Sequence, residues 1–323
     1  MNTLKKYSRF LAYLLPIAAF ILVGSMIPNF LKISNLLNIM RQCSVIAICA
    51  VGMTSVIVIK GIDLSVGGTI SLCAMVSGLL MLNGVNMVIA MTAAAVLGCL
   101  IGIFSGLMVV KLEVPSFITT LVVGQVAQGI TFVLNNGKSI GGFNKSYVFI
   151  GNGAFLGIPI SNYIMLIFVL AGAFVTTKLP IGTHIYGLGG NEAVEKQEGI
   201  NTGFVKIFVF AIAGLCSAIA GILLSAQLDT VYPIQGEPYQ LDTIAACVIG
   251  GVSMMGGEGK VTMSLVGALI IGSARNALNL LGVHPFYQNI FVGAIIIIVV
   301  AVNIYSKNRK ESMTQYQFGA PVE

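Results

Sequence analysis

The feature that most constrains this chain is a succession of apolar segments, each about 20 residues long, separated by short polar turns. A segment of this length crosses the hydrocarbon core of a bilayer as an α-helix. Hydrophobic residues make up 57% of the chain and charged residues only 9%, and the mean hydropathy is +0.96. Soluble domains carry about 25% charged residues, so a soluble fold is excluded. The sequence predicts an all-α polytopic membrane protein with one transmembrane domain over residues 1–323.

The length allows about ten spans joined by short loops. The expected spans are Leu11–Ile27, Cys43–Ile59, Leu64–Leu82, Asn86–Val110, Pro115–Leu134, Ser161–Lys178, Lys206–Gln227, Leu241–Met255, Val261–Leu281 and Tyr287–Tyr305. Residues 28–41 mix apolar and polar side chains, which predicts a short interfacial helix with Ser34 as its N-cap. Residues 135–160 and 228–240 are expected to be outer loops.

Basic residues gather on one side of this topology. The side assigned to the exterior carries only Lys32, Arg41, Lys138 and Lys145, whereas most of the remaining Lys and Arg fall on the other side. Short cytoplasmic segments of membrane proteins are enriched in Lys and Arg. We therefore expect residues 1–10, the loop 179–205 and the tail 306–323 to be cytoplasmic. Both termini then lie inside, and the chain belongs in the cell (inner) membrane.

Several kinds of site are excluded by pattern. The basic residues are scattered and form no stripe, so the net charge of +6 does not indicate nucleic-acid binding. All six Cys lie in apolar segments without metal-ligand spacing and are expected to pack as small hydrophobic residues. His184 and His284 are far apart and have no neighbouring ligands, so no metal site is predicted.

Residues 58–71 are the most informative stretch, because they place polar groups and glycines between two apolar segments. Gly61, Gly67 and Gly68 favour a broken helix, and broken backbone in a bilayer is tolerated only where protein or a water-filled cavity covers it. An intramembrane carboxylate such as Asp63 faces a polar path or a partner, for which Lys60 is the nearest candidate. Asp63 could instead cap the broken helix. The stretch could also be an ordinary cytoplasmic turn.

A weak internal repeat pairs residues 61–64 with residues 240–243, each containing a hydrophobic-Asp step. The first falls at an inner turn and the second at an outer turn, which is typical of an inverted repeat with the transport path at its interface. A rival alignment pairs glycines of residues 61–78 with those of 250–267 and indicates a parallel repeat. Separately, Gly98, Gly102 and Gly106 are spaced to let helices approach closely.

The loop 179–205 predicts a short capped helix on the cytoplasmic face. Asn191 is a suitable N-cap, Glu192 lies in the first turn, where the helix dipole favours negative charge, and Gly199 stops the helix. Such a helix fits a groove on a partner, although the loop could also be a solvated connector. The chain contains no G-x-x-x-x-G-K-[ST] phosphate-binding loop, so any ATP is hydrolysed by another subunit.

Five stretches in order along the chain carry a resemblance to a known family. They are Gly61–Gly67 (GIDLSVG), Val114–Leu121 (VPSFITTL), Gly189–Glu192 (GGNE) through Gly199–Asn201 (GIN), Tyr239–Ala246 (YQLDTIAA), and Gly256–Gly259 (GGEG) leading into Asn279–Val283 (NLLGV). On these motifs the chain resembles the membrane-spanning permease subunit of ribose-type carbohydrate ABC importers.

The resemblance implies a transport subunit and not an enzyme. It implies a second permease copy or paralogue, two ATP-binding subunits that bind ATP and Mg²⁺, and an extracytoplasmic sugar-binding protein; no cofactor is expected in this chain. The substrate would be a ribose-like monosaccharide or a related polyol. Pro238 and Tyr239 are expected to dock the binding protein. The family's coupling helix, which enters the ATPase cleft, matches a segment that contains Gly190, Asn191, Glu192, Ala193, Glu195 and Gly199.

Three features depart from the family's pattern. Glu258 stands where the family usually has Arg in a Gly-Gly-Arg-Gly run, and Gln128 replaces a residue that is often Arg. Residues 193–199 differ from the usual Ala-Ala-Arg-Leu-Ser-Gly. These departures bear on the identity of the ATPase and the substrate but leave the class unchanged.

The path is expected to use polar residues within or beside spans. The candidates for its lining or gates are Asp63, Ser65, Gln125, Asp242, Arg275 and Asn276. Arg275 is expected to pair with a carboxylate or to face the cavity, and Gln125 and Gln128 are expected to be buried amides that need partners. An alternative is an ion-gradient-driven secondary transporter of a small polar solute, with Asp63 and Asp242 in proton or Na⁺ coupling. An intramembrane hydrolase is excluded because no Ser/His pairing is apparent.

Overall fold

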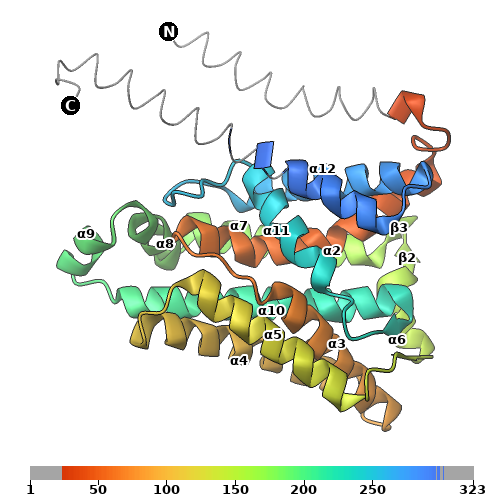
Figure 1. Ribbon diagram of the computed structural model, residues 1–323, viewed down its shortest axis with the longest axis horizontal. Helices are drawn as coiled ribbons and strands as arrows, with labels where there is room; N and C mark the ends of the chain where they lie inside the picture. Colours follow the sequence, from red (N-terminus) through yellow and green to blue (C-terminus); the bar gives the residue numbers. More distant parts are fainter. Residues whose placement is uncertain (1–23, 296, 299–300, 302–323) are drawn as a thin grey trace.

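The chain folds into a bundle of helices that run roughly along one axis (Figure 1). The computed structural model describes residues 24–295, 297–298 and 301. Six described helices are long and apolar enough to cross a membrane. They are α2 (Ile33–Val58), α4 (Met87–Lys111), α5 (Ser116–Leu134), α7 (Ile160–Lys178), α10 (Thr202–Leu228) and α12 (Val261–Leu280). The prediction of an all-α polytopic membrane protein is confirmed.

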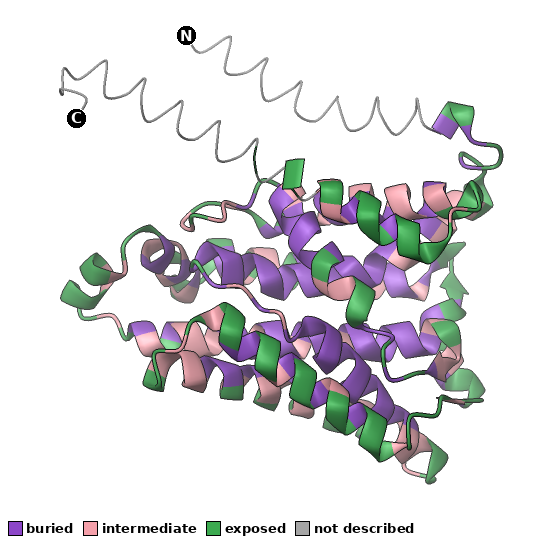
Figure 2. Ribbon diagram, in the orientation of Figure 1, coloured by how far each residue is buried: buried purple, intermediate pink, exposed green. Residues whose placement is uncertain are grey.

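Two helices form the centre of the bundle. In the most apolar stretch of α2, 89% of residues are buried, and in that of α10, 72%. The corresponding shares are only 22% for α4 and 28% for α5 and α7. Figure 2 shows exposed residues along the length of α5. A helix that is apolar on all sides belongs inside a membrane bundle. The buried run Cys43–Val58 of α2 meets that condition.

The expected break between an interfacial helix and the second span is wrong, because α2 is continuous. Its N-cap position is Lys32, which makes no side-chain cap, so the expectation of a Ser34 cap is also wrong. The polar residues of the first turns find partners without interrupting the helix. Arg41 donates to Asn38 at 2.9 Å and to Asn152 at 2.7 Å.

Glycines bring α4 and α10 into close contact, as their spacing predicted. A Cβ on Gly102 would overlap the carbonyl oxygen of Phe210, and one on Gly98 would press against Ala218 and the carbonyl of Gly214. In lipid, no hydrophobic effect drives helices together. Helix–helix contacts there depend on close packing, which small residues allow.

Two shorter helices, α3 (Val66–Leu82) and α11 (Glu237–Ile249), begin inside the bundle (Figure 1). The loop before each of them enters the bundle first. Before α3, Lys60 adopts a left-handed φ of 64° and residues 61–65 are not helical. The helix break that the glycines predicted lies at Gly61, whereas Gly67 and Gly68 are inside α3. The expected outer loop 228–240 and the span 241–255 need correction, because α11 already begins at Glu237 and ends at Ile249.

The two ends of the bundle differ. One end carries α6 (Lys145–Asn152) and four two-residue strands, β1 (Ile140–Gly141), β2 (Ala154–Phe155), β3 (Ile158–Pro159) and β4 (Thr230–Val231). Strand β1 pairs with β4 and β2 with β3, both antiparallel, so the region expected as an irregular loop is ordered. Buried Tyr147 anchors it by donating a 2.9 Å hydrogen bond to the carbonyl of Ile222.

The opposite end carries α8 (Pro180–Gly190) and α9 (Glu192–Gln197), which projects from the bundle (Figure 1). Residues 180–190, for which the sequence predicted no element, form α8. Beyond α12, residues 285–295 are helical. The expected segments 1–10 and 306–323 lie outside the described residues, as do most of Leu11–Ile27 and part of Tyr287–Tyr305.

Candidate functional site

The N-terminal ends of α3 and α11 meet inside the bundle. The backbone N–H of Gly236 donates to Ser71 Oγ at 3.0 Å, and a Cβ on Gly67 would lie 3.0 Å from the carbonyl oxygen of Gly236. Helix α5 closes in from the side, because a Cβ on Gly68 would overlap the carbonyl oxygen of Gly124. Three elements therefore converge at glycines, which permit the close backbone approach.

A polar cleft of about 510 Å³ opens at this junction. Its lining comes from α3, α5 and α11 and includes Gly67, Gly68, Gln125, Gln128, Gly129, Phe132, Glu237, Gln240 and Leu241. Gln125 is exposed and Gln128 is half-buried, so the expectation that both amides are buried is wrong. Uncharged amides and one carboxylate can donate to and accept from hydroxyl groups. The cleft can therefore hold a neutral polar solute.

Asp63 holds the broken backbone before α3. Its Oδ1 accepts hydrogen bonds from the backbone N–H of Ser65 at 2.8 Å and from Ser65 Oγ at 2.6 Å. Both side chains are buried and do not line the cleft. Lys60 does not pair with Asp63, as the sequence suggested it could, but donates to the carbonyl of Gly190 at 3.2 Å. Asp63 thus holds the turn that leads into α3, but Ser65 is the N-cap residue and no side chain caps the helix; the role of Asp63 in the path stays a prediction.

A buried ion pair ties α11 to α12. Arg275 donates from Nε to one oxygen of Asp242 at 2.6 Å and from an Nη atom to the other at 2.7 Å. The side chains are only 17% and 2% exposed, respectively. The expectation that Arg275 pairs with a carboxylate is confirmed. A two-point contact of this kind fixes geometry as well as charge.

Asn276, the next residue, connects α12 to α2. Its side chain and that of Asn35 exchange two hydrogen bonds, at 2.9 and 3.1 Å. Of the six candidates for the path, only Gln125 lines the cleft, while the others secure the helices around it. Sequence reasoning did not select Glu237 and Gln240 for the path. Their i, i+3 spacing at the start of an apolar helix was the available signal.

The projecting helix α9 is capped as predicted. Asn191 Oδ1 accepts from the backbone N–H of Ala193 at 3.0 Å, and Gly199 ends the turn with φ 82°. Glu192 lies 2.8 Å from Lys206 of α10 and 3.0 Å from Lys196. Partial burial, the largest influence, raises the pKa of Glu192, but the hydrogen bonds and charges of Lys206 and Lys196 outweigh it, so the net pKa is lowered.

The other coupling candidates lie at the junction of α8 and α9. Glu195 folds back against α8, where one carboxylate oxygen lies 3.5 Å from His184 Nδ1 and the other would be overlapped by a Cβ on Gly187. Gly190 accepts the hydrogen bond from Lys60, so this junction rests on the end of α2. Ala193 is exposed within α9.

Pro238 and Tyr239 lie in the first turn of α11 and not in a loop. Tyr239 is half-buried and packs against the main core. Their docking role stays a prediction.

Broken helices that meet at a polar cleft within an apolar bundle define a polytopic membrane transport protein. Comparison with known families agrees: residues 35–300 match the family described as branched-chain amino acid transport system / permease component. The chain belongs to this family of permeases, which are transport components and not enzymes.

The chain is also similar to curated permeases over most of its length. It is 41% identical to the ribose import permease protein of Haemophilus influenzae over 93% of this chain and 94% of that protein. It is 42% identical to the ribose import permease protein of Escherichia coli over 87% of this chain and 89% of that protein. It is 35% identical to the D-allose transport system permease protein of Escherichia coli over 92% and 91%. No solved structure matches the chain.

Proposed function

We propose that this chain is the permease subunit of an ATP-driven, binding-protein-dependent importer of a ribose-like monosaccharide or a related polyol. The observation that carries the proposal is the similarity to ribose and D-allose permeases, which extends over about nine-tenths of both chains. The cleft supports it, because the groups of Gln125, Gln128 and Gln240 suit hydroxyl-bearing solutes.

The motor is a separate subunit. The projecting helix α9 has no buried residue and is held by its Asn191 cap and by Glu192. In the proposed complex it lies in the cytosol and enters a groove of an ATP-binding subunit, which binds ATP and Mg²⁺. This chain then needs no cofactor of its own. Closure of the two ATP-binding subunits would move α9 and tilt the permease between its two states.

About ten spans fit the fold if α3 and α11 are each counted as one span together with the non-helical residues that precede them. The non-helical residues 61–65 enter from the α9 end before α3, whereas the residues before α11 enter from the opposite end (Figure 1). This opposed arrangement supports the inverted repeat of residues 61–64 and 240–243. Two further spans are expected at the chain ends, outside the described residues. With these two added, the number of spans is even and both chain termini lie in the cytoplasm.

A second permease copy covers the exposed face of α5. Gln125 is exposed at the middle of this helix, where lipid contact with an amide is costly. The other exposed large side chains of α5 are apolar, as are those of α7 before its final turn, so Gln125 is the polar exception on an otherwise apolar face. The polar cleft therefore opens toward the second copy, and the sugar passes between them. Such a path should bind only weakly, since tight binding would trap the substrate.

The two carboxylates that the secondary-transporter alternative would use are both engaged. Asp63 accepts two hydrogen bonds from Ser65 and Asp242 is paired with Arg275, so neither is available for ion coupling in this conformation. The similarity to ABC-type import permeases also separates the two classes.

The test is reconstitution. The permease is placed in liposomes with ATP-binding subunits and a sugar-binding protein from the same organism, and uptake of radiolabelled ribose is measured. We expect uptake that requires ATP and the binding protein and that persists after an ionophore collapses all ion gradients. Uptake without ATP that the ionophore abolishes would refute the proposal in favour of a secondary transporter.

A further inference from the structure

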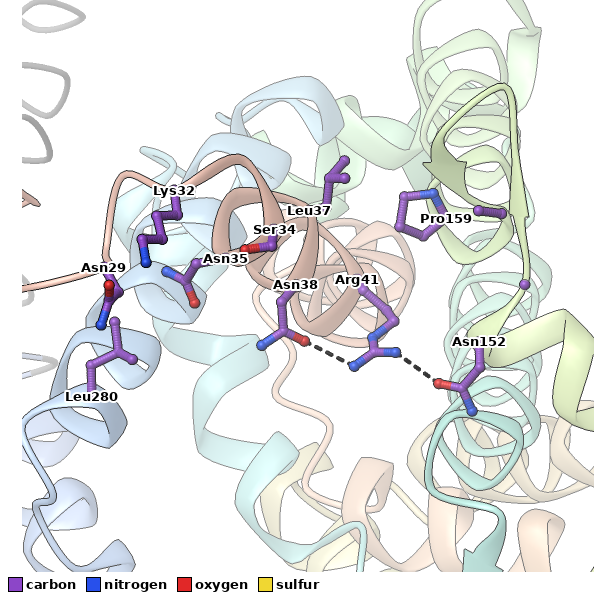
Figure 3. A pocket seen from close by; sticks show the side chains of 12 residues that line it. Asn29, Lys32, Ser34, Asn35, Leu37, Asn38, Arg41, Asn152, Pro159 and Leu280 are labelled. Atoms are coloured by element: carbon purple, nitrogen blue, oxygen red, sulfur yellow. Dashed lines mark hydrogen bonds between the residues drawn. The ribbon is translucent and has the colours of Figure 1, made fainter.

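A second polar pocket, of about 560 Å³, lies at the end of the bundle opposite α9. We call it the outer groove and define it by Asn29, Lys32, Asn35, Asn38, Arg41 and Asn152. These residues come from the start of α2, the turn before it and the end of α6. Figure 3 shows Arg41 between Asn38 and Asn152, with Lys32 and Asn29 at the far side of the groove.

The positive charge of the outer groove is not neutralised within the described chain. No described carboxylate lies within 4.0 Å of Lys32 or Arg41. Asp229, at the same end, accepts instead from the backbone N–H of Phe143. Arg41 is fixed by two amides, and the Lys32 ammonium group makes no hydrogen bond with a described residue. A held guanidinium without a counter-charge is suited to a carboxylate from another molecule.

The rim of the groove adds apolar contact area. The β2–β3 hairpin, whose Ala154 and Pro159 line the groove, ends in Phe155 and Leu156, which are 61% and 83% exposed. Exposed aromatic and apolar residues beside a held Arg are the composition that protein interfaces favour. An anionic lipid headgroup would also satisfy the charge, and the experiment below distinguishes it from a protein.

We propose that the outer groove docks an acidic surface of the extracytoplasmic sugar-binding protein, with carboxylates of that protein placed against Arg41 and Lys32. This inference rests on the proposed function, which puts the groove on the outer side. Docking here lies beside α2, which Asn35 connects to Asn276 of α12. Charge complementarity of this kind accelerates association and sets the orientation of the partner.

The test uses the permease with its ATP-binding subunits in nanodiscs of phosphatidylcholine alone. Binding of the sugar-loaded binding protein is measured for wild type, Lys32→Gln, Arg41→Gln and the double variant. Each single change should raise the dissociation constant about three- to tenfold at low salt, and high salt should shrink the difference. The ATPase rate at saturating binding protein should not change, because the groove is not part of the path.

Two further variants keep the outcome decisive. Lys138→Gln removes the same charge from an exposed position at the same end but outside the groove, and should bind as wild type. Arg41→Lys keeps the charge while losing the paired amide contacts, and should retain most of the affinity. Equal binding by Lys32→Gln, Arg41→Gln and Lys138→Gln would overturn the inference. An effect that appears only with anionic lipid would assign the groove to a headgroup. If wild type itself neither binds nor responds to the binding protein, the proposed function fails first.

Discussion

Lys206 of α10 and Glu192 of α9 join the projecting helix to the bundle, with the Lys206 Nζ 2.8 Å from both carboxylate oxygens of Glu192. Lys196 approaches the same carboxylate at 3.0 Å. Since α9 has no buried residue, this contact is its main connection to a membrane-spanning helix. A force on α9 is therefore passed to α10, one of the two central helices.

The first prediction reverses this charge. Glu192→Lys places three cations together and should release α9 from α10, lowering ATP-driven uptake about tenfold, while the amount of folded permease in the membrane stays the same. The double variant Glu192→Lys, Lys206→Glu restores a pair and should recover much of the uptake. Uptake by Glu192→Lys at the wild-type rate would remove the coupling role from Glu192.

The pH dependence of the same contact follows from its sign. Lys206 and Lys196 hold the pKa of Glu192 below its ordinary value in the folded protein, against the opposing effect of partial burial. A lowered carboxyl pKa contributes stability above the ordinary pKa of about 4.3 and loses it only as the pH falls through the lowered value. The ratio of uptake by wild type to uptake by Glu192→Gln should therefore be constant between about pH 6 and pH 8. A ratio that falls toward pH 6 would contradict this.

The Asp242–Arg275 pair gives a stability prediction. Arg275→Met leaves the Asp242 carboxylate buried without a partner, which should destabilise the fold by about 3–5 kcal/mol. Thermal unfolding of the purified protein in detergent measures the change. The double variant Asp242→Asn, Arg275→Met removes the unpaired charge and should recover part of the loss. Equal stability of the two variants would show that the lone carboxylate is solvated.

Glycines at the junction of α3 and α5 allow a matched comparison. Gly68→Ala forces a methyl group into the carbonyl of Gly124 and should cost about 1–3 kcal/mol through overpacking. Gly129→Ala lies in the lining of the same cleft, but nothing stands within 4 Å of its added Cβ. It should fold as wild type in the same unfolding measurement. A similar loss of stability in both variants would show that the loss comes from changing the cleft lining and not from overpacking against Gly124.

Patterns local in sequence predicted much of this molecule. The Asn191 cap, the stop at Gly199, the break before α3 and the close approach at Gly98 and Gly102 are all confirmed, because each depends on a few neighbouring residues or on helix periodicity.

Features that depend on distant partners were less accessible. The continuity of α2 depends on Asn276 and Asn152, which lie far along the chain and satisfy its polar residues. Asp63 and Asn276 were expected as path candidates because they are polar residues within or beside spans, yet both side chains are buried outside the cleft. Composition cannot distinguish a polar group that caps or clamps from one that faces a cavity, since both avoid lipid for the same reason.

The last prediction concerns Gln125, the one residue among the six path candidates that lines the cleft. Gln125→Leu keeps a similar volume but removes the amide from the proposed path. Loss of one or two hydrogen bonds to a passing sugar should lower uptake about three- to tenfold, while basal ATPase activity and folding stay the same. Val126→Leu, at the neighbouring exposed position of α5, is the control and should transport as wild type. If α5 faced lipid instead of a second permease, Gln125→Leu would improve the membrane fit of the helix and leave uptake unchanged. Uptake measured in the reconstituted system therefore distinguishes an α5 that faces the path from one that faces lipid, because removal of the amide lowers uptake only if Gln125 faces the path.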